Sequence, residues 1–180
     1  INRTRFHVHH FRPLGAALVG MAGGVIFAAV AFRFRYPQLS AFMHQHLSHQ
    51  IPGHLQILRS GFFQSQRKGL RCAVGSSGFL ANVDFVLDKC AIRSYFSAIV
   101  AGDQVTKCKP DPEIYLTAAA KLGLEPSECV VFEDAEAGIE SAKRAGIKVV
   151  ALATTFDREF LRNTEADIIV DDFRDVNVAM

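Results

Sequence analysis

The sequence predicts an α/β fold in which a parallel β-sheet is flanked by helices. From about residue 69 onward, short apolar runs rich in Val, Ile and Ala alternate with segments that have the periodicity of helices. The apolar runs are nearly continuous, as expected of strands that are buried on both faces. With 180 residues, of which 49% are hydrophobic, the chain is long enough to bury a core.

Strands and helices alternate along this part of the chain. Five strands are predicted, at residues 70–74, 98–100, 129–132, 148–151 and 167–170. Four helices are predicted between them, at residues 82–90, 112–122, 138–145 and 157–162. Pro112 suits the first turn of its helix, and Gly123 and Gly146 follow their helices as stop signals. We therefore assign residues 68–180 to an α/β core and residues 1–67 to a region of atypical composition.

The first 83 residues differ from the rest of the chain in charge. They contain no Asp or Glu, nine Arg or Lys and all seven His, which is a formal charge of +9. Residues 84–180 carry all eighteen acidic residues and a formal charge of −7. A stretch of this length without a carboxylate indicates a basic arm, a membrane segment, or a translated sequence that selection has not shaped.

Residues 14–32 form an uncharged apolar run of 19 residues, which is just long enough to cross a bilayer as a helix. Within it, Gly20 and Gly24 have the G-x-x-x-G spacing that allows close helix packing. However, its glycines weaken a helix, basic residues flank both of its ends, and the Val-Ile-Phe portion fits a buried strand followed by a turn equally well. A membrane span is therefore kept as an alternative.

Histidines and cysteines form no recognisable metal or redox site. His44, His46, His49 and His54 have no carboxylate or cysteine beside them, so we interpret them as solvated residues. The four cysteines are far apart and include no C-x-x-C pair, which indicates free thiols in a reducing compartment. The basic and Phe residues of segment 36–69 belong to no known nucleic-acid module, so no nucleic-acid partner is expected. We expect a cytoplasmic monomer.

The residues after each predicted strand are the candidates for chemistry, because ligands bind beyond the carboxyl ends of the strands in such a sheet. Gly-Ser-Ser-Gly at 75–78 follows the first strand and offers hydroxyls and backbone N–H groups to a phosphate. Lys109 lies in a proline-containing segment after the second strand and could neutralise an anionic oxygen. Glu133 and Asp134 end the third strand, and adjacent carboxylates suit a hard cation such as Mg²⁺.

Each of these groups also has a purely structural interpretation. Ser76 and Ser77 could cap a helix, Lys109 could be a solvated turn residue, and the two carboxylates could cap the next helix. Their order and their positions at three strand ends favour one combined site, because phosphoryl transfer depends mostly on positioning and charge neutralisation. We predict a phosphate site formed by Ser76, Ser77 and Lys109, with Mg²⁺ held by Glu133 and Asp134.

Three ordered segments are similar to known motifs: AVGSSG at 73–78, AGDQVTKCKPDPEIY at 101–115 and VVFEDAEAGIESAKRAG at 130–146. They resemble the haloacid dehalogenase-like (HAD) superfamily, and in particular its β-phosphoglucomutase-like phosphatases and mutases. The resemblance covers residues 68–173 and implies a Rossmann-like parallel sheet. It implies that Ser76 binds the transferring phosphoryl group and that Lys109 stabilises its charge. It also implies that Glu133 and Asp134 hold Mg²⁺ directly or through water.

The first motif of this family is missing. In the family an apolar strand ends in D-x-D-G, where the first Asp is the nucleophile and the second is the general acid/base, but no Asp precedes Asp84 here. The nearest match is segment 24–31, which places Ala28 and Val30 at the two carboxylate positions. Only about 45 residues then remain before Ser76, too few for the helical cap of this branch. Covalent catalysis needs that carboxylate, so we expect little or no turnover.

The other early aspartates are not expected to replace the nucleophile, since Asp84 and Asp88 fall in a predicted helix and Asp103 follows a different strand. The resemblance implies a Mg²⁺-dependent phosphatase or phosphomutase for a small phosphorylated metabolite such as a sugar phosphate, inactive in this form. The chain is then either a fragment or frameshifted copy of a catalytic parent, in keeping with its start at Ile1, or a natural descendant without catalysis. The alternative function is a non-catalytic binding or regulatory module, with or without a membrane anchor at residues 14–32.

Overall fold

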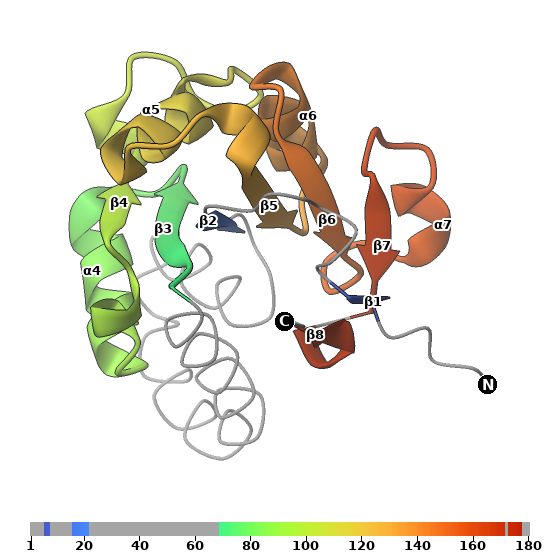
Figure 1. Cartoon of the computed structure of the whole chain (residues 1–180), viewed down its shortest axis with the longest axis horizontal. Coiled ribbons are helices and arrows are strands. Elements are labelled where there is room, and N and C mark those ends of the chain that lie inside the picture. The colour runs from blue at the N-terminus through green and yellow to red at the C-terminus, as the bar shows by residue number, and fades with distance from the viewer. Residues whose placement is uncertain (1–5, 8–15, 22–68, 172, 178–180) are drawn as a thin grey trace, which may run out of the picture.

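The computed structural model of the chain describes residues 6–7, 16–21, 69–171 and 173–177. Within these residues, a six-stranded sheet has helices on both of its faces (Figure 1). The strand order is β4-β3-β2-β5-β6-β7, and every neighbouring pair is parallel. The strands are β2 (Ala16–Met21), β3 (Arg71–Ser76), β4 (Ala98–Val100), β5 (Cys129–Glu133), β6 (Lys148–Leu152) and β7 (Ile168–Val170).

The helices follow the strands in alternation, as the sequence predicts. The α-helices are α4 (Leu80–Lys89), α5 (Glu113–Leu122), α6 (Glu136–Arg144) and α7 (Arg158–Leu161). Short 3₁₀ turns are η2 (Arg93–Tyr95), η3 (Gly102–Gln104), η4 (Pro126–Glu128) and η5 (Phe173–Asp175). A separate parallel pair joins β1 (Phe6–His7) to β8 (Val176–Asn177). The predicted α/β class with a parallel sheet and flanking helices is confirmed.

The core consists of two layers because successive strand side chains point to opposite faces of the sheet. In β3, Ala73 packs in the cluster that includes Ile114 of α5, whereas Val74 packs in the cluster that includes Val83 of α4. Helices α5 and α6 cover the first face, as Figure 1 shows above the sheet. Strands that are buried on both faces explain why their sequences are continuous apolar runs.

The position of the strand next to β3 differs from the prediction. The sequence places it at segment 24–31, which lies outside the described residues, whereas residues 16–21 form β2 between β3 and β5. A continuous membrane helix over residues 14–32 is therefore wrong, since six of its residues form a strand of the sheet. Among the described residues, no helix is both long and apolar enough to cross a bilayer.

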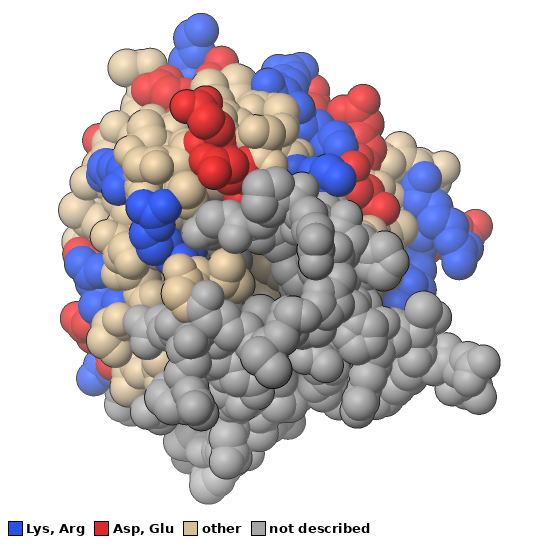
Figure 2. All heavy atoms as spheres, in the orientation of Figure 1, with Lys and Arg blue, Asp and Glu red and all other residues tan. Residues whose placement is uncertain are grey.

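Charged side chains of both signs are interspersed over the described part of the face shown in Figure 2. Ion pairs among the described residues include Lys143 with Asp167 and Arg158 with Asp171.

Candidate functional site

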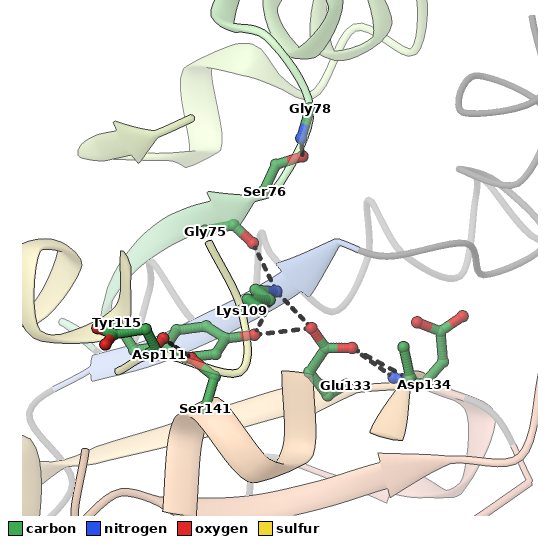
Figure 3. A network of polar contacts seen from close by, with 10 residues as sticks. Gly75, Ser76, Gly78, Lys109, Asp111, Tyr115, Glu133, Asp134 and Ser141 are labelled. Atoms are coloured by element: carbon green, nitrogen blue, oxygen red, sulfur yellow. Dashed lines mark hydrogen bonds and ion pairs between the residues drawn. The ribbon is translucent and has the colours of Figure 1, made fainter. Parts of the chain in front are cut away.

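The predicted site residues meet at the carboxyl edge of the sheet. Strand β3 ends at Ser76 and strand β5 ends at Glu133, with β2 between them. Lys109 reaches this edge from the loop that connects η3 to α5 (Figure 3). The parallel topology explains the meeting, because all strands of such a sheet end on the same side. Three of the motifs that the sequence singled out therefore form one cluster.

Lys109 is the centre of a buried polar network. Its Nζ donates to Glu133 Oε1 at 2.5 Å, to the phenol oxygen of Tyr115 at 2.8 Å and to the carbonyl of Gly75 at 3.2 Å. The side chains of Lys109 and Glu133 are only 2% and 0% exposed. An ammonium group has three N–H donors, so all three are used within the protein. The interpretation of Lys109 as a solvated turn residue is wrong.

Glu133 is held on both of its carboxylate oxygens. Oε1 accepts from Lys109 and from the hydroxyl of Tyr115, at 2.8 Å for the latter. Oε2 accepts from the backbone N–H of Asp134 at 2.9 Å and of Ala135 at 3.1 Å. A buried carboxylate is tolerated only when it is paired and hydrogen-bonded in this way. Glu133 therefore anchors the start of α6 and the lysine loop together.

Asp134 lies next to this network but in a different setting. It is 4% exposed, and its Oδ2 accepts from the hydroxyl of Thr155 at 2.5 Å. Burial raises the pKa of Asp134 to about 6, the Thr155 hydrogen bond offsets part of the rise, and the charge of Glu133 adds to it. Such a group gains from a nearby cation that stabilises its charged form.

Ser76 and Ser77 do not cap helix α4. The hydroxyl oxygen of Ser76 accepts the backbone N–H of Gly78 at 3.1 Å, and Ser76 itself is buried. The N–H of Leu80 at the start of α4 is instead bound by Asp103 Oδ1 at 2.9 Å. The helix-cap interpretation of the two serines is therefore wrong, and Asp103 has a structural role that the sequence analysis missed.

The loop that carries Lys109 is fastened at several points. Glu113 accepts from the hydroxyl of Thr106 at 2.6 Å and from the backbone N–H groups of Thr106 and Lys107. Ser141 of α6 donates to the carbonyl of Asp111 at 2.7 Å, and Asp111 Oδ1 accepts the N–H of Glu113. These bonds hold the lysine segment against α5 and α6, so Lys109 enters the site from a constrained backbone.

The donor set fits a magnesium ion that keeps much of its water. In the described part of the chain, no group of three or more His, Cys, Asp or Glu side chains could hold a metal. Mg²⁺ is commonly bound by one or two carboxylates together with waters and phosphate oxygens. Asp134 meets that requirement, whereas both oxygens of Glu133 already accept protein donors.

Two residues of the network were absent from the sequence-based site. Thr155 lies shortly after β6, so the same rule about strand ends would have pointed to it. Tyr115 lies inside α5 and is completely buried. Burial raises the pKa of Tyr115 well above its usual value, and the charge of Glu133 adds to the rise, so the phenol stays protonated and can donate. No sequence signal distinguishes a buried tyrosine of this kind from an ordinary core residue.

The residue at the end of β2 has no carboxylate. Strand β2 pairs with β3 so that Gly20 lies opposite Gly75 and Met21 lies opposite Ser76. The carbonyl of Gly75 accepts from Lys109, so Gly20 is next to the network. Strand β2 thus ends with Gly20-Met21 at the position expected of D-x-D-G, whereas the sequence-based position is segment 24–31. Neither segment contains an acidic residue.

Comparisons with known proteins agree with this architecture. A family model described as haloacid dehalogenase-like hydrolase matches residues 25–152. The start of that match agrees with the sequence-based position of the first motif, whereas the sheet contains residues 16–21; both positions lack an acid. The described strands from β3 to β6 all lie inside the match.

Curated relatives and solved structures are also similar. Validoxylamine A 7'-phosphate phosphatase of Streptomyces hygroscopicus subsp. limoneus is 38% identical over 126 residues, 70% of this chain and 56% of the relative. β-Phosphoglucomutase of Bacillus subtilis is 41% identical over 87 residues, 48% of this chain and 38% of the relative. The crystal structure of β-phosphoglucomutase from Clostridium difficile has a TM-score of 0.67 and 16% identity, covering 89% of this chain and 92% of that chain. The chain spans between 12% and 56% of the length of the curated relatives that it matches.

Proposed function

Because the chain belongs to the haloacid dehalogenase-like hydrolases, in their β-phosphoglucomutase-like branch, we propose that it binds a small phosphorylated metabolite of the sugar phosphate kind together with Mg²⁺. We further propose that the chain in this form does not turn the metabolite over. The fold, the motifs and the phosphatase relatives support the first part. The missing carboxylate supports the second. A cytoplasmic location is part of the same proposal.

The observation that carries this function is the convergence of Ser76, Lys109 and Asp134 at one edge of the sheet. The hydroxyl of Ser76 and the backbone N–H groups of the following loop suit the oxygens of a phosphoryl group. Lys109 supplies positive charge in a buried setting, where charge interactions are stronger than in water. Ser77 belongs to the same loop and is exposed.

Magnesium would be held by Asp134 and would neutralise charge on the phosphoryl oxygens when bound, whereas both oxygens of Glu133 keep their protein donors. HAD-family phosphatases generally use Mg²⁺, and the carboxylate of Asp134 is suited to it. The protein's own residues bind and orient the phosphoryl group, and burial excludes water from around Lys109. The set therefore retains recognition of a phosphate without the group that attacks it.

None of the nearest aspartates takes the place of the nucleophile. Asp84 and Asp88 lie in α4, as predicted, and Asp84 forms an ion pair with Arg93. Asp103 caps α4 through the N–H of Leu80. A covalent phosphoryl intermediate needs a carboxylate aimed at the phosphorus, so binding without turnover is the expected behaviour.

The test is calorimetric titration of the full chain with inorganic phosphate in the presence and absence of Mg²⁺. We expect binding that Mg²⁺ strengthens and that Asp134→Asn loses. The matched control is Asp88→Asn, which removes an exposed carboxylate from α4 and is expected to bind as the parent does. Absence of phosphate binding in the parent, or equal Mg²⁺ dependence in Asp134→Asn, would contradict the proposal.

The second candidate function is a non-catalytic binding or regulatory module. It is favoured by the same observation that disfavours turnover, the absence of any acidic residue before Asp84. Introducing acidic residues at the position of the first motif distinguishes the two candidates. Hydrolysis should return if the chain is an enzyme that has lost only its nucleophile, and it should not return if the chain is a binding module.

A further inference from the structure

Tyr115 of α5 contacts three other parts of the chain at the site: β3, β5 and the loop that carries Lys109. Its hydroxyl donates to Glu133 Oε1 at 2.8 Å and accepts from Lys109 Nζ at 2.8 Å. The Nζ also lies 4.6 Å from the centroid of the Tyr115 ring, within the range of a cation–π contact. The ring packs against Gly75, where an added Cβ would be only 3.1 Å from Tyr115 Cε1. One side chain of α5 thus contacts β3, β5 and the lysine loop (Figure 3).

One of the three hydrogen bonds of Lys109 is easier to replace than the other two. Of its three acceptors, Glu133 Oε1 carries charge and Tyr115 is at 2.8 Å, whereas the Gly75 carbonyl is neutral and farther away, at 3.2 Å. An oxyanion beside Ser76 would compete most easily for the N–H that now points to Gly75, because Gly75 and Ser76 are adjacent at the end of β3. The other two contacts would keep the ammonium in place.

We propose that Tyr115 is a positioning residue: its hydroxyl fixes the Lys109–Glu133 ion pair so that the ammonium of Lys109 lies at the end of β3 beside Ser76. This inference rests on the proposed oxyanion site for its consequence, but the positioning itself is a property of the free protein. Tyr115 does not touch a ligand in this arrangement and acts through Lys109.

The direct readout of the positioning is the side-chain ¹⁵N–¹H signal of the Lys109 ammonium. In the parent, three simultaneous hydrogen bonds and burial should slow hydrogen exchange enough for this signal to be observed, and Lys109→Met identifies it by its loss. We expect Tyr115→Phe, which keeps the ring, to shift or broaden the signal. Tyr95→Phe removes a phenol hydroxyl from η2 and should leave it unchanged.

The consequence for binding is read in the same variants with inorganic phosphate and Mg²⁺. At the net value of a typical intramolecular hydrogen bond, loss of the Tyr115 hydroxyl should weaken phosphate binding about 3- to 10-fold in Tyr115→Phe. In the Lys109→Met background the same change should have little further effect, because the hydroxyl acts through the lysine. A purely structural role predicts an equal loss in both backgrounds, which would overturn the proposal.

The two proposals fail separately. If the parent binds no phosphate, the proposed function fails, and the Lys109 signal alone decides the role of Tyr115. An ammonium signal that is absent from the parent, or identical in the parent and Tyr115→Phe, overturns the positioning role even if phosphate binds. If Tyr115→Phe does not fold, incorporation of 3-fluorotyrosine keeps the shape and changes the hydroxyl; an unaltered Lys109 signal would then overturn the proposal.

Discussion

Gly138 lies directly against the carboxylate of Glu133. A β-carbon added at residue 138 would come within 1.9 Å of Glu133 Oε1 and 2.1 Å of its carboxyl carbon. The carboxylate cannot easily move away, because Lys109 and Tyr115 bind Oε1 and two backbone N–H groups bind Oε2. The glycine in the first turn of α6 is therefore required by the buried ion pair of the site.

The first prediction concerns this contact. Gly138→Ala should destabilise the fold by about 1–3 kcal/mol, despite the better helix propensity of Ala, because the added methyl group displaces the Glu133 carboxylate. Urea unfolding measures the change. Ala137→Ser adds one heavy atom at the exposed neighbouring position of α6 and should cost far less. Equal stability of Gly138→Ala and the parent would show that Glu133 is free to shift.

The second prediction concerns the buried charge of Asp134. Burial raises its pKa from 3.8 to about 6, so the folded state takes up a proton and this group's contribution to stability falls as the pH rises from about 4 to above 6. Asp134→Asn removes that cost and should raise the free energy of unfolding at pH 7.5 in EDTA, on the order of 1–3 kcal/mol.

Urea unfolding at pH 5 and pH 7.5, with EDTA present, measures this effect. The gain from Asp134→Asn should be smaller at pH 5, where the parent carboxyl is largely protonated. Asp88→Asn, on the exposed surface of α4, serves as the control at both pH values. If Asp134→Asn is less stable than its parent at pH 7.5, the buried charge of Asp134 does not destabilise the folded state, and the prediction is wrong.

The third prediction concerns the missing nucleophile. The register of β2 places Gly20 beside the Lys109 network, so the double variant Gly20→Asp, Ala22→Asp should introduce Mg²⁺-dependent hydrolysis of p-nitrophenyl phosphate at least about 10-fold above the parent. The matched variant Ala28→Asp, Val30→Asp uses the sequence-based position and should stay at the parent rate. Activity in the second variant alone would place the first motif at 24–31. Activity in neither would favour the binding module.

The fourth prediction concerns the thiols. Cys108 is exposed, whereas burial raises the pKa of Cys72 to about 11 and that of Cys129 likewise to about 11. Because the thiolate is the reactive form, iodoacetamide at pH 8 should modify Cys108 first and leave Cys72 and Cys129 largely unmodified until the chain is unfolded. Peptide mass spectrometry with and without urea measures the order. Early modification of Cys72 would contradict its burial in β3.

Residue patterns along the chain were enough to predict the α/β class, the order of the elements and the motifs at their ends. The strand at 98–100 is observed at the predicted bounds, and α5 and α6 lie within two residues of theirs. These predictions succeeded because buried parallel strands need continuous apolar runs, and Gly123 and Gly146, with φ of 65° and 74°, mark where helices must end. The absence of a nucleophile was also evident from residue types alone.

How the site residues share their hydrogen bonds became evident only from their arrangement in space. The sequence predicted that Lys109 binds phosphate and that Glu133 binds the metal, as separate ligands. In the fold the two form one buried ion pair, and the hydroxyl of Tyr115 is hydrogen-bonded to both. The fold also places residues 16–21 in the sheet, between β3 and β5. Both outcomes depend on contacts between residues that are distant in the sequence. Lys109 and Glu133 are 24 positions apart and Tyr115 and Glu133 are 18 apart, so no local periodicity signals these contacts.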